Sequence, residues 1–141
     1  MRILIRLLLL LLLTAIIVQP QEKDKWERVY TLEDATIAMN TTRVEFSGGE
    51  IAAVQFRWNY SKPQSLDNSS DLKYRTRVET VEFNCARRRY RTAGYTLLDN
   101  KGKAILSIKP EQPEEWKFVK GGSMMERLLG PACKLIDEKR P

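Results

Sequence analysis

The sequence of 141 residues contains no histidine and only two cysteines. Without histidine, neither a Ser-His or Cys-His catalytic pair nor an imidazole-bound metal site can form. Two cysteines are too few for a four-thiolate zinc or iron–sulfur site. Glycine is also sparse, and the pairs Gly48–Gly49 and Gly121–Gly122 are too short for a phosphate-binding loop. We therefore expect no metal, no other cofactor and no catalysis, because the carboxylates are too dispersed to form an acid–base pair.

The first residues have a composition of their own. Arg2 and Arg6 precede an apolar run over residues 7–18, after which the sequence turns polar. This pattern predicts a secretory signal peptide over residues 1–20 and a single mature domain over residues 21–141. The run is shorter than the roughly 20 residues of a membrane-spanning helix, which favours cleavage. Few small residues precede the cleavage point, so retention of the segment as a membrane anchor remains the alternative.

Export of the protein determines how its two cysteines are interpreted. The first of them, Cys85, lies far beyond the apolar run, so the sequence has no lipoprotein signal. We expect a secreted or periplasmic protein that could reach the cell surface, with no stable membrane span once the signal is cleaved. In an oxidising compartment, Cys85 and Cys133 predict one intramolecular disulfide. A redox-active pair would favour Cys-x-x-Cys spacing or a helix-start thiolate, and the sequence has neither.

Apolar side chains alternate with polar ones from residue 26 to residue 107. This period predicts an antiparallel β-sheet of about six strands. The expected strands comprise residues 26–30, 36–39, 43–46, 54–60, 72–85, 95–98 and 104–108. We expect Asn40, Thr41 and Thr42 to form a hairpin turn between two of these strands. The apolar parity changes within 72–85, which predicts a bulge or bend near Glu79–Thr80 or a sheet covered on both faces.

A helical period begins after Gly121–Gly122. Ser123 and Glu126 have the spacing of a capping box, and the apolar residues that follow recur on one helix face that includes Cys133. Because an interior proline costs about 3 kcal/mol, we expect a kink or a restart at Pro131. The predicted fold class is α+β: an antiparallel sheet with a C-terminal helix packed on it, joined by one disulfide.

Several short motifs occur in a fixed order along the mature chain: the run 81–91, the Tyr95 strand, the turn 99–103, Trp116, the helix start at Gly122–Ser123 and the late Cys133. In order and spacing they resemble the bacterial surface-adhesin E-like family over residues 26–136. The resemblance implies a non-catalytic, exported binding module of the cell envelope that contacts host matrix proteins, and it leaves a homodimer open. The alternative is a periplasmic accessory subunit or an inhibitor of another envelope protein.

One segment concentrates positive charge next to an aromatic ring. Its members are Arg87, Arg88, Arg89, Tyr90 and Arg91. Such guanidinium groups bind sulfate, phosphate and carboxylate, which makes a polyanion or an acidic protein surface the candidate partner. Nucleic acid fits this chemistry but not the compartment. A strand would place the first, third and fifth of these residues on one face, where Glu79, Glu82 or Glu45 could neutralise them. An ion-paired, solvated face therefore remains the alternative to a binding site.

Overall fold

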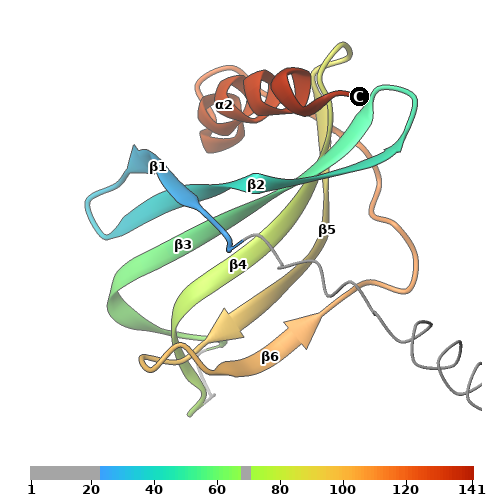
Figure 1. The fold of residues 1–141 in the computed structure, drawn as a ribbon. Coiled ribbons are helices and arrows are strands. Elements are labelled where there is room, and N and C mark those ends of the chain that lie inside the picture. Colours follow the sequence, from blue (N-terminus) through green and yellow to red (C-terminus); the bar gives the residue numbers. More distant parts are fainter. Residues whose placement is uncertain (1–22, 68–70) are drawn as a thin grey trace, which may run out of the picture.

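A single antiparallel sheet and one helix make up residues 23–67 and 71–141, the parts of the chain that the computed structural model describes (Figure 1). The elements are β1 (Trp26–Thr31), β2 (Ala35–Gly48), β3 (Ile51–Ser65), β4 (Lys73–Asn84), β5 (Arg89–Leu98), β6 (Ala104–Ile108), β7 (Lys117–Phe118) and α2 (Met124–Lys139). The predicted α+β class is confirmed, with the main strands in the order β1 to β6 and β7 paired with β5. The predicted signal peptide at 1–20 lies outside the described residues.

The predicted hairpin at Asn40–Thr42 is wrong, because β2 is one strand of 14 residues. The pairing of β2 with β3 passes from Met39 directly to Val44, so the intervening residues form a bulge. Asn40 is fully buried, and its Oδ1 accepts hydrogen bonds from the Thr42 backbone N–H (3.1 Å) and hydroxyl (2.8 Å). A buried amide needs such partners. These local bonds bend the strand without reversing it.

A second bulge lies close to the predicted position. Strands β3 and β4 pair without interruption from Ile51–Asn84 to Asn59–Thr76. Between β4 and β5, Thr80 faces Gly94 while Val81 faces Thr92, which leaves Ala93 as the extra residue. The irregularity expected near Glu79–Thr80 is therefore present, but its extra residue belongs to the neighbouring strand.

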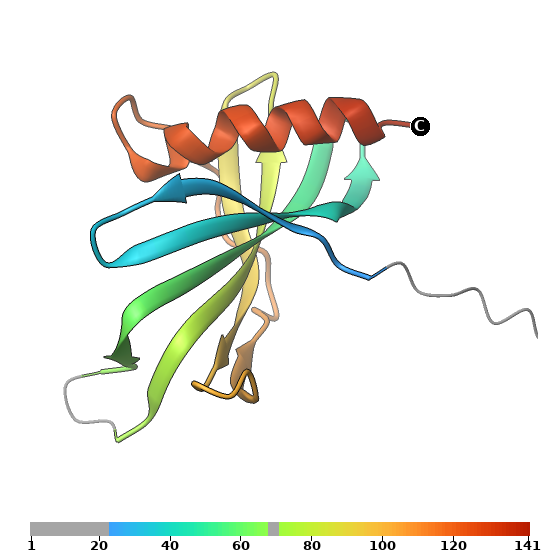
Figure 2. The same ribbon diagram turned by 60° about the vertical axis from the view of Figure 1, so that its left-hand side comes forward.

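The start of helix α2 follows the capping pattern. Ser123 Oγ accepts a hydrogen bond from the Glu126 N–H at 3.2 Å, and Glu126 Oε2 accepts one from the Gly122 N–H at 2.6 Å. The restart expected at Pro131 is not observed, because α2 is one helix of 16 residues, drawn without a break in Figure 2. Gly130 precedes the proline and has no Cβ to clash with its ring, which lowers the cost of helical backbone there.

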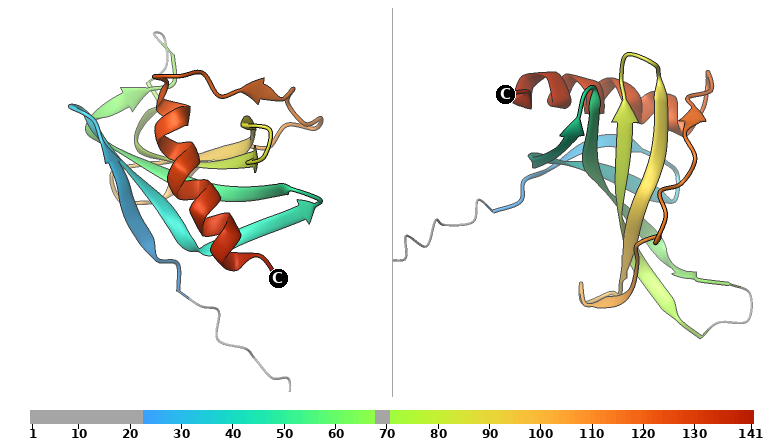
Figure 3. Two further views of the ribbon diagram at one scale, coloured as in Figure 1. Left: turned by 90° about the horizontal axis from the view of Figure 1, so that it is seen from above. Right: turned by 90° about the vertical axis from the view of Figure 1, so that its right-hand side faces the viewer.

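The hydrophobic core lies at one end of the sheet. Helix α2 crosses only that end, while β4 and β5 extend well past it (Figure 3). The helix buries Leu128, Leu129, Ala132, Leu135 and Ile136. These residues pack with Phe56 and Phe83, whose rings meet edge to face at 6.1 Å. Burying a large apolar side chain contributes about 1.5–3 kcal/mol. The helix-free face of the sheet and the far halves of β4 and β5 are not covered by α2.

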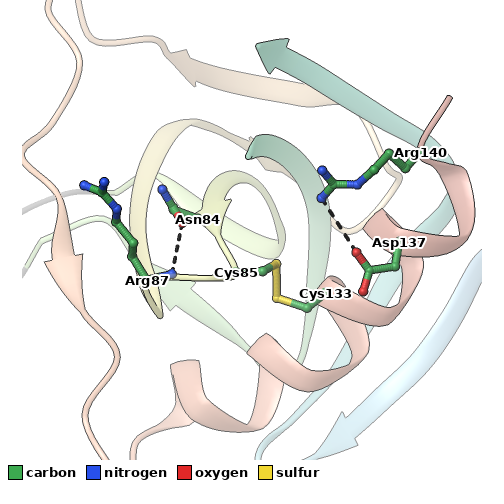
Figure 4. Close-up of a disulfide and its surroundings, with 6 residues drawn as sticks. All are labelled: Asn84, Cys85, Arg87, Cys133, Asp137 and Arg140. Carbon is green, nitrogen blue, oxygen red and sulfur yellow. Dashed lines mark hydrogen bonds and ion pairs between the residues drawn. A yellow bond between two sulfur atoms is a disulfide. The ribbon is translucent and has the colours of Figure 1, made fainter. Parts of the chain in front are cut away.

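The disulfide joins the helix to the sheet. Cys85 follows β4, Cys133 lies in α2, and their Cα atoms are 5.8 Å apart (Figure 4). The predicted pairing is confirmed. The closed loop spans 48 residues, and a loop of this length lowers the entropy of the unfolded chain by an amount worth about 4 kcal/mol.

Candidate binding surface

The predicted arginine segment is divided between a turn and a strand. Arg87 and Arg88 lie in the turn that joins β4 to β5, and β5 begins at Arg89. Arg88 has a left-handed backbone with φ of 49°. The strand alternation expected for all five residues is therefore wrong for the first two and holds only from Arg89 onward.

Tyr90 faces the core. It pairs with Phe83 across the β4–β5 ladder and packs against the buried cluster beneath α2. Its ring therefore stabilises the fold, and the aromatic ring that accompanies the exposed cations comes from another strand.

That ring is Phe118 of β7. β7 pairs with the beginning of β5, where Arg89 faces Phe118, and the Arg89 guanidinium stacks on the ring with its Cζ 4.3 Å from the centroid. Phe118 keeps 65% of its surface exposed. Among the described residues Arg89 forms no ion pair. Its charge is therefore balanced by no carboxylate of the described residues; Arg89 is half-buried, and its Nε is buried with no hydrogen-bond partner there.

The two turn arginines differ in their contacts. Arg88 Nη2 lies 3.2 Å from Glu126 Oε1, and its carbonyl accepts a hydrogen bond from Val119 at 2.9 Å. Arg88 thus links the turn to the helix start and to β7. The backbone N–H of Arg87 donates to Asn84 Oδ1 at 3.0 Å, while its exposed side chain extends away from the disulfide (Figure 4).

Arg91 is neutralised within the fold. It forms an ion pair with Glu82 across the β4–β5 ladder and stacks on Trp116, with its Cζ 4.4 Å from the ring centroid. Its side chain is 20% exposed and that of Glu82 is 16% exposed. Of the three carboxylates considered from the sequence, Glu82 is the one that pairs with this segment. Arg91 belongs to the framework.

The candidate binding residues therefore do not form the linear segment expected from the sequence. They form a surface with contributions from the β4–β5 turn, β5 and β7. We name this surface the arginine corner; its members are Arg87, Arg89 and Phe118. Sequence reasoning missed Phe118, since only the β5–β7 pairing brings it to Arg89. Within the described part of the chain, no ion pair neutralises Arg87 or Arg89.

Displaced pKa values occur away from the arginine corner. Burial raises the pKa of Tyr60, and the neighbouring Tyr74 raises it further. The backbone N–H groups of Lys103 and Lys101 hold the pKa of the exposed Asp99 below its usual value. Tyr60 and Asp99 both line a hollow at the far end of the strands.

Metal binding and membrane spanning have no structural support in the described residues. Residues 23–67 and 71–141 contain no group of three or more His, Cys, Asp and Glu side chains that could hold a metal ion. In the same ranges, every helix is too short or too polar to cross a membrane.

Comparison with known proteins finds one matching family model and solved structures with a similar fold. A family model described as surface-adhesin protein E matches residues 26–134. The crystal structure of protein E from non-typeable Haemophilus influenzae is similar with a TM-score of 0.59 and 11% identity, over 86% of this chain and 83% of that chain. A second structure of Haemophilus influenzae protein E has a TM-score of 0.58 and 10% identity, over 87% and 94% of the two chains. At these identities the likeness shows the fold alone. No curated protein sequence matches the chain.

Proposed function

The chain belongs to the surface-adhesin protein E family, and on this premise we propose that it is an exported, non-catalytic binding module of the cell envelope. We infer that the arginine corner contacts an acidic partner, such as a sulfated polysaccharide or the acidic surface of a matrix protein. The observation that carries the proposal is Arg89, which is supported by an aromatic ring and has no carboxylate partner within the described residues.

Chemistry favours an anionic partner over a neutral one at this place. Arg87 and Arg89 offer planar guanidinium groups, which bind sulfate and carboxylate with paired hydrogen bonds. Stacking on Phe118 orients Arg89 before any partner arrives. Because the cation is already oriented, less conformational entropy is lost on binding.

Retention on immobilised heparin tests the proposal. We expect Arg87→Ser/Arg89→Ser to elute at clearly lower salt than the wild type, because it removes both unpaired guanidinium groups. The matched control is Arg28→Ser/Arg43→Ser, which removes the same net charge from exposed positions on β1 and β2. Screening by salt weakens any non-specific attraction equally in both variants. Equal elution of the two double variants would contradict the arginine corner as the binding surface. Capture of one self-encoded envelope protein without heparin retention would favour an accessory subunit or inhibitor.

A further inference from the structure

The helix-free face of the sheet carries a hollow of about 420 Å³. On β3 and β4, the pairs Ala53–Glu82 and Gln55–Thr80 alternate with the core pair Val54–Val81, so they point away from the helix. The polar residues that line the hollow include Glu45, Gln55, Thr80, Glu82, Ser107 and Lys109. We name it the sheet hollow. Its volume lies within the range of small-molecule sites, about 300–1,000 Å³.

Small residues form its floor. Ala53, Ala93 and Gly94 all line the hollow, and Ala93 is the bulge residue of β5. A Cβ on Gly94 would lie 2.7 Å from the Ile108 carbonyl oxygen, so β5 and β6 approach too closely there for any side chain. A second hollow of about 240 Å³ shares Glu82, Ala93 and Lys109 with the first. The bulge residue Ala93 therefore lies where the two hollows meet.

Side chains from neighbouring strands hold the polar groups around this floor in place. Asn40, which is fully buried, donates from Nδ2 to Gln55 Oε1 at 3.2 Å. That bond fixes the orientation of the Gln55 amide and leaves its nitrogen free to donate. Glu82 is fixed by Arg91, which is stacked on Trp116. A site built from oriented polar groups loses little entropy when a ligand binds.

Further hydrogen-bonding groups complete the rim. The Thr96 and Ser107 hydroxyls lie 3.0 Å apart, so one of them donates to the other and a hydroxyl hydrogen is left for a ligand. Among the residues that line the sheet hollow, Glu82 is neutralised by its ion pair with Arg91, which leaves Glu45 and Lys109 as one charge of each sign. Glu111 adds a carboxylate to the second hollow. The sheet hollow therefore has no large excess of either charge, unlike the arginine corner, and its groups include both donors and acceptors.

From this arrangement we infer that the sheet hollow binds a short, neutral saccharide. Each sugar hydroxyl both donates and accepts, which matches carboxylate acceptors beside amide and ammonium donors. The alanine floor offers an apolar contact to the C–H face of a sugar ring. An anion would meet Glu45 and Glu82, and a cation would meet Lys109. An extended peptide would pair with the outer edge of β6 and would have no use for the fixed Gln55 amide.

Saturation-transfer difference NMR with maltotriose, chitotriose and lactose at millimolar concentration tests the site on the full exported chain. We expect at least one of these probes to bind the wild type. Gln55→Glu keeps an acceptor for Asn40 but removes the free donor, so we expect an affinity loss of about tenfold. Ala93→Trp fills the floor and should abolish the signal. Gln64→Glu and Ala104→Trp make the same changes outside the hollow and should bind as the wild type does.

The outcomes separate this site from the arginine corner. Arg87→Ser/Arg89→Ser should retain saccharide binding even where heparin retention is lost, because the corner contributes no group to the sheet hollow. Absence of a signal from all three saccharides would overturn the inference, as would unchanged binding by Gln55→Glu in a protein whose amide spectrum remains native. Binding of an unstructured peptide that Ala93→Trp abolishes, without saccharide binding, would also overturn it.

Discussion

Arg89 and Arg91 occupy alternate positions of β5 and stack on aromatic rings of the same short segment, at 4.3 Å from Phe118 and 4.4 Å from Trp116. They differ in one neighbour, because Glu82 pairs with Arg91 and no ion pair reaches Arg89 among the described residues. Stacking alone therefore does not distinguish a structural arginine from one that we propose as a binding residue. The carboxylate does, since it decides whether the charge is satisfied inside the fold or is left for a partner.

A similar difference separates the two surfaces described above, since Arg89 belongs to the arginine corner and Arg91 neutralises Glu82 of the sheet hollow. The arginine corner has excess positive charge and an exposed ring, whereas the sheet hollow has no large excess of either charge over a floor of small residues. A surface with one sign of charge recognises its partner mainly by electrostatics, so salt weakens it. A balanced site depends on hydrogen-bond geometry and is less sensitive to salt. Salt titration of heparin and saccharide binding should therefore give different slopes.

The largest expected effect is a loss of stability, and it should loosen one of the two surfaces more than the other. Removing the disulfide with Cys85→Ser/Cys133→Ser should lower the free energy of unfolding by about 4 kcal/mol, because the unfolded chain regains the entropy of the open loop. Urea unfolding measures the loss. Because Cys85 begins the turn that carries Arg87, amide exchange should rise more in the arginine corner than around Gln55. Equal acceleration at both surfaces would show that the disulfide does not hold the corner in particular.

A smaller effect compares the two arginines directly. Arg91→Ala leaves the largely buried carboxylate of Glu82 without its partner, and we expect a loss of about 2 kcal/mol, below the 3–5 kcal/mol of a fully buried pair. Arg89→Ala removes only a stack at a partly exposed ring, worth about 0.5–1 kcal/mol. Urea unfolding of both variants measures the difference, and Glu82→Gln in the Arg91→Ala background should recover part of the loss. Similar destabilisation by both alanine variants would refute the distinction.

The smallest effect concerns a carboxylate held by backbone N–H groups in place of an arginine. Asp99 Oδ1 accepts hydrogen bonds from Lys101 N (2.8 Å) and Lys103 N (2.9 Å), which lower its pKa in the folded state. Its contribution to stability is therefore present above the unfolded pKa of about 3.9 and is lost as the pH falls through the lower folded value. We expect Asp99→Asn to reduce the acid dependence slightly in urea unfolding between about pH 5 and pH 2. An unchanged acid dependence would show that solvent screens these bonds.

Features encoded by neighbouring residues could be predicted from the sequence. The helix start follows from Ser123 and Glu126, and the single disulfide follows from having only Cys85 and Cys133 to pair. The strands that alternate strictly were also recognisable. In each case the determining residues lie within one element or admit one pairing only.

What escaped prediction depends on contacts between distant residues. The β2 bulge replaces a hairpin because Asn40 is buried against Gln55, which is contributed by the next strand. The arginine corner needs Phe118, which reaches Arg89 only after the chain returns along the edge of β5. The sheet hollow depends on Ala93, the extra residue of a bulge in β5, whereas the sequence predicted an irregularity near Glu79–Thr80 of the neighbouring strand. Sequence periodicity describes each strand alone and carries no register between strands.

The disulfide also has a mechanical consequence. A pulling force applied on either side of Cys85 and Cys133 passes through the sulfur bridge, so the chain between these two residues, which are 48 positions apart, cannot extend. At about 3.4 Å per residue, roughly 160 Å of chain is withheld from stretching. Every member of the arginine corner lies inside this covalent loop, whereas Gln55 of the sheet hollow lies outside it. Under tension, the corner would keep its shape after the first strands had begun to peel away.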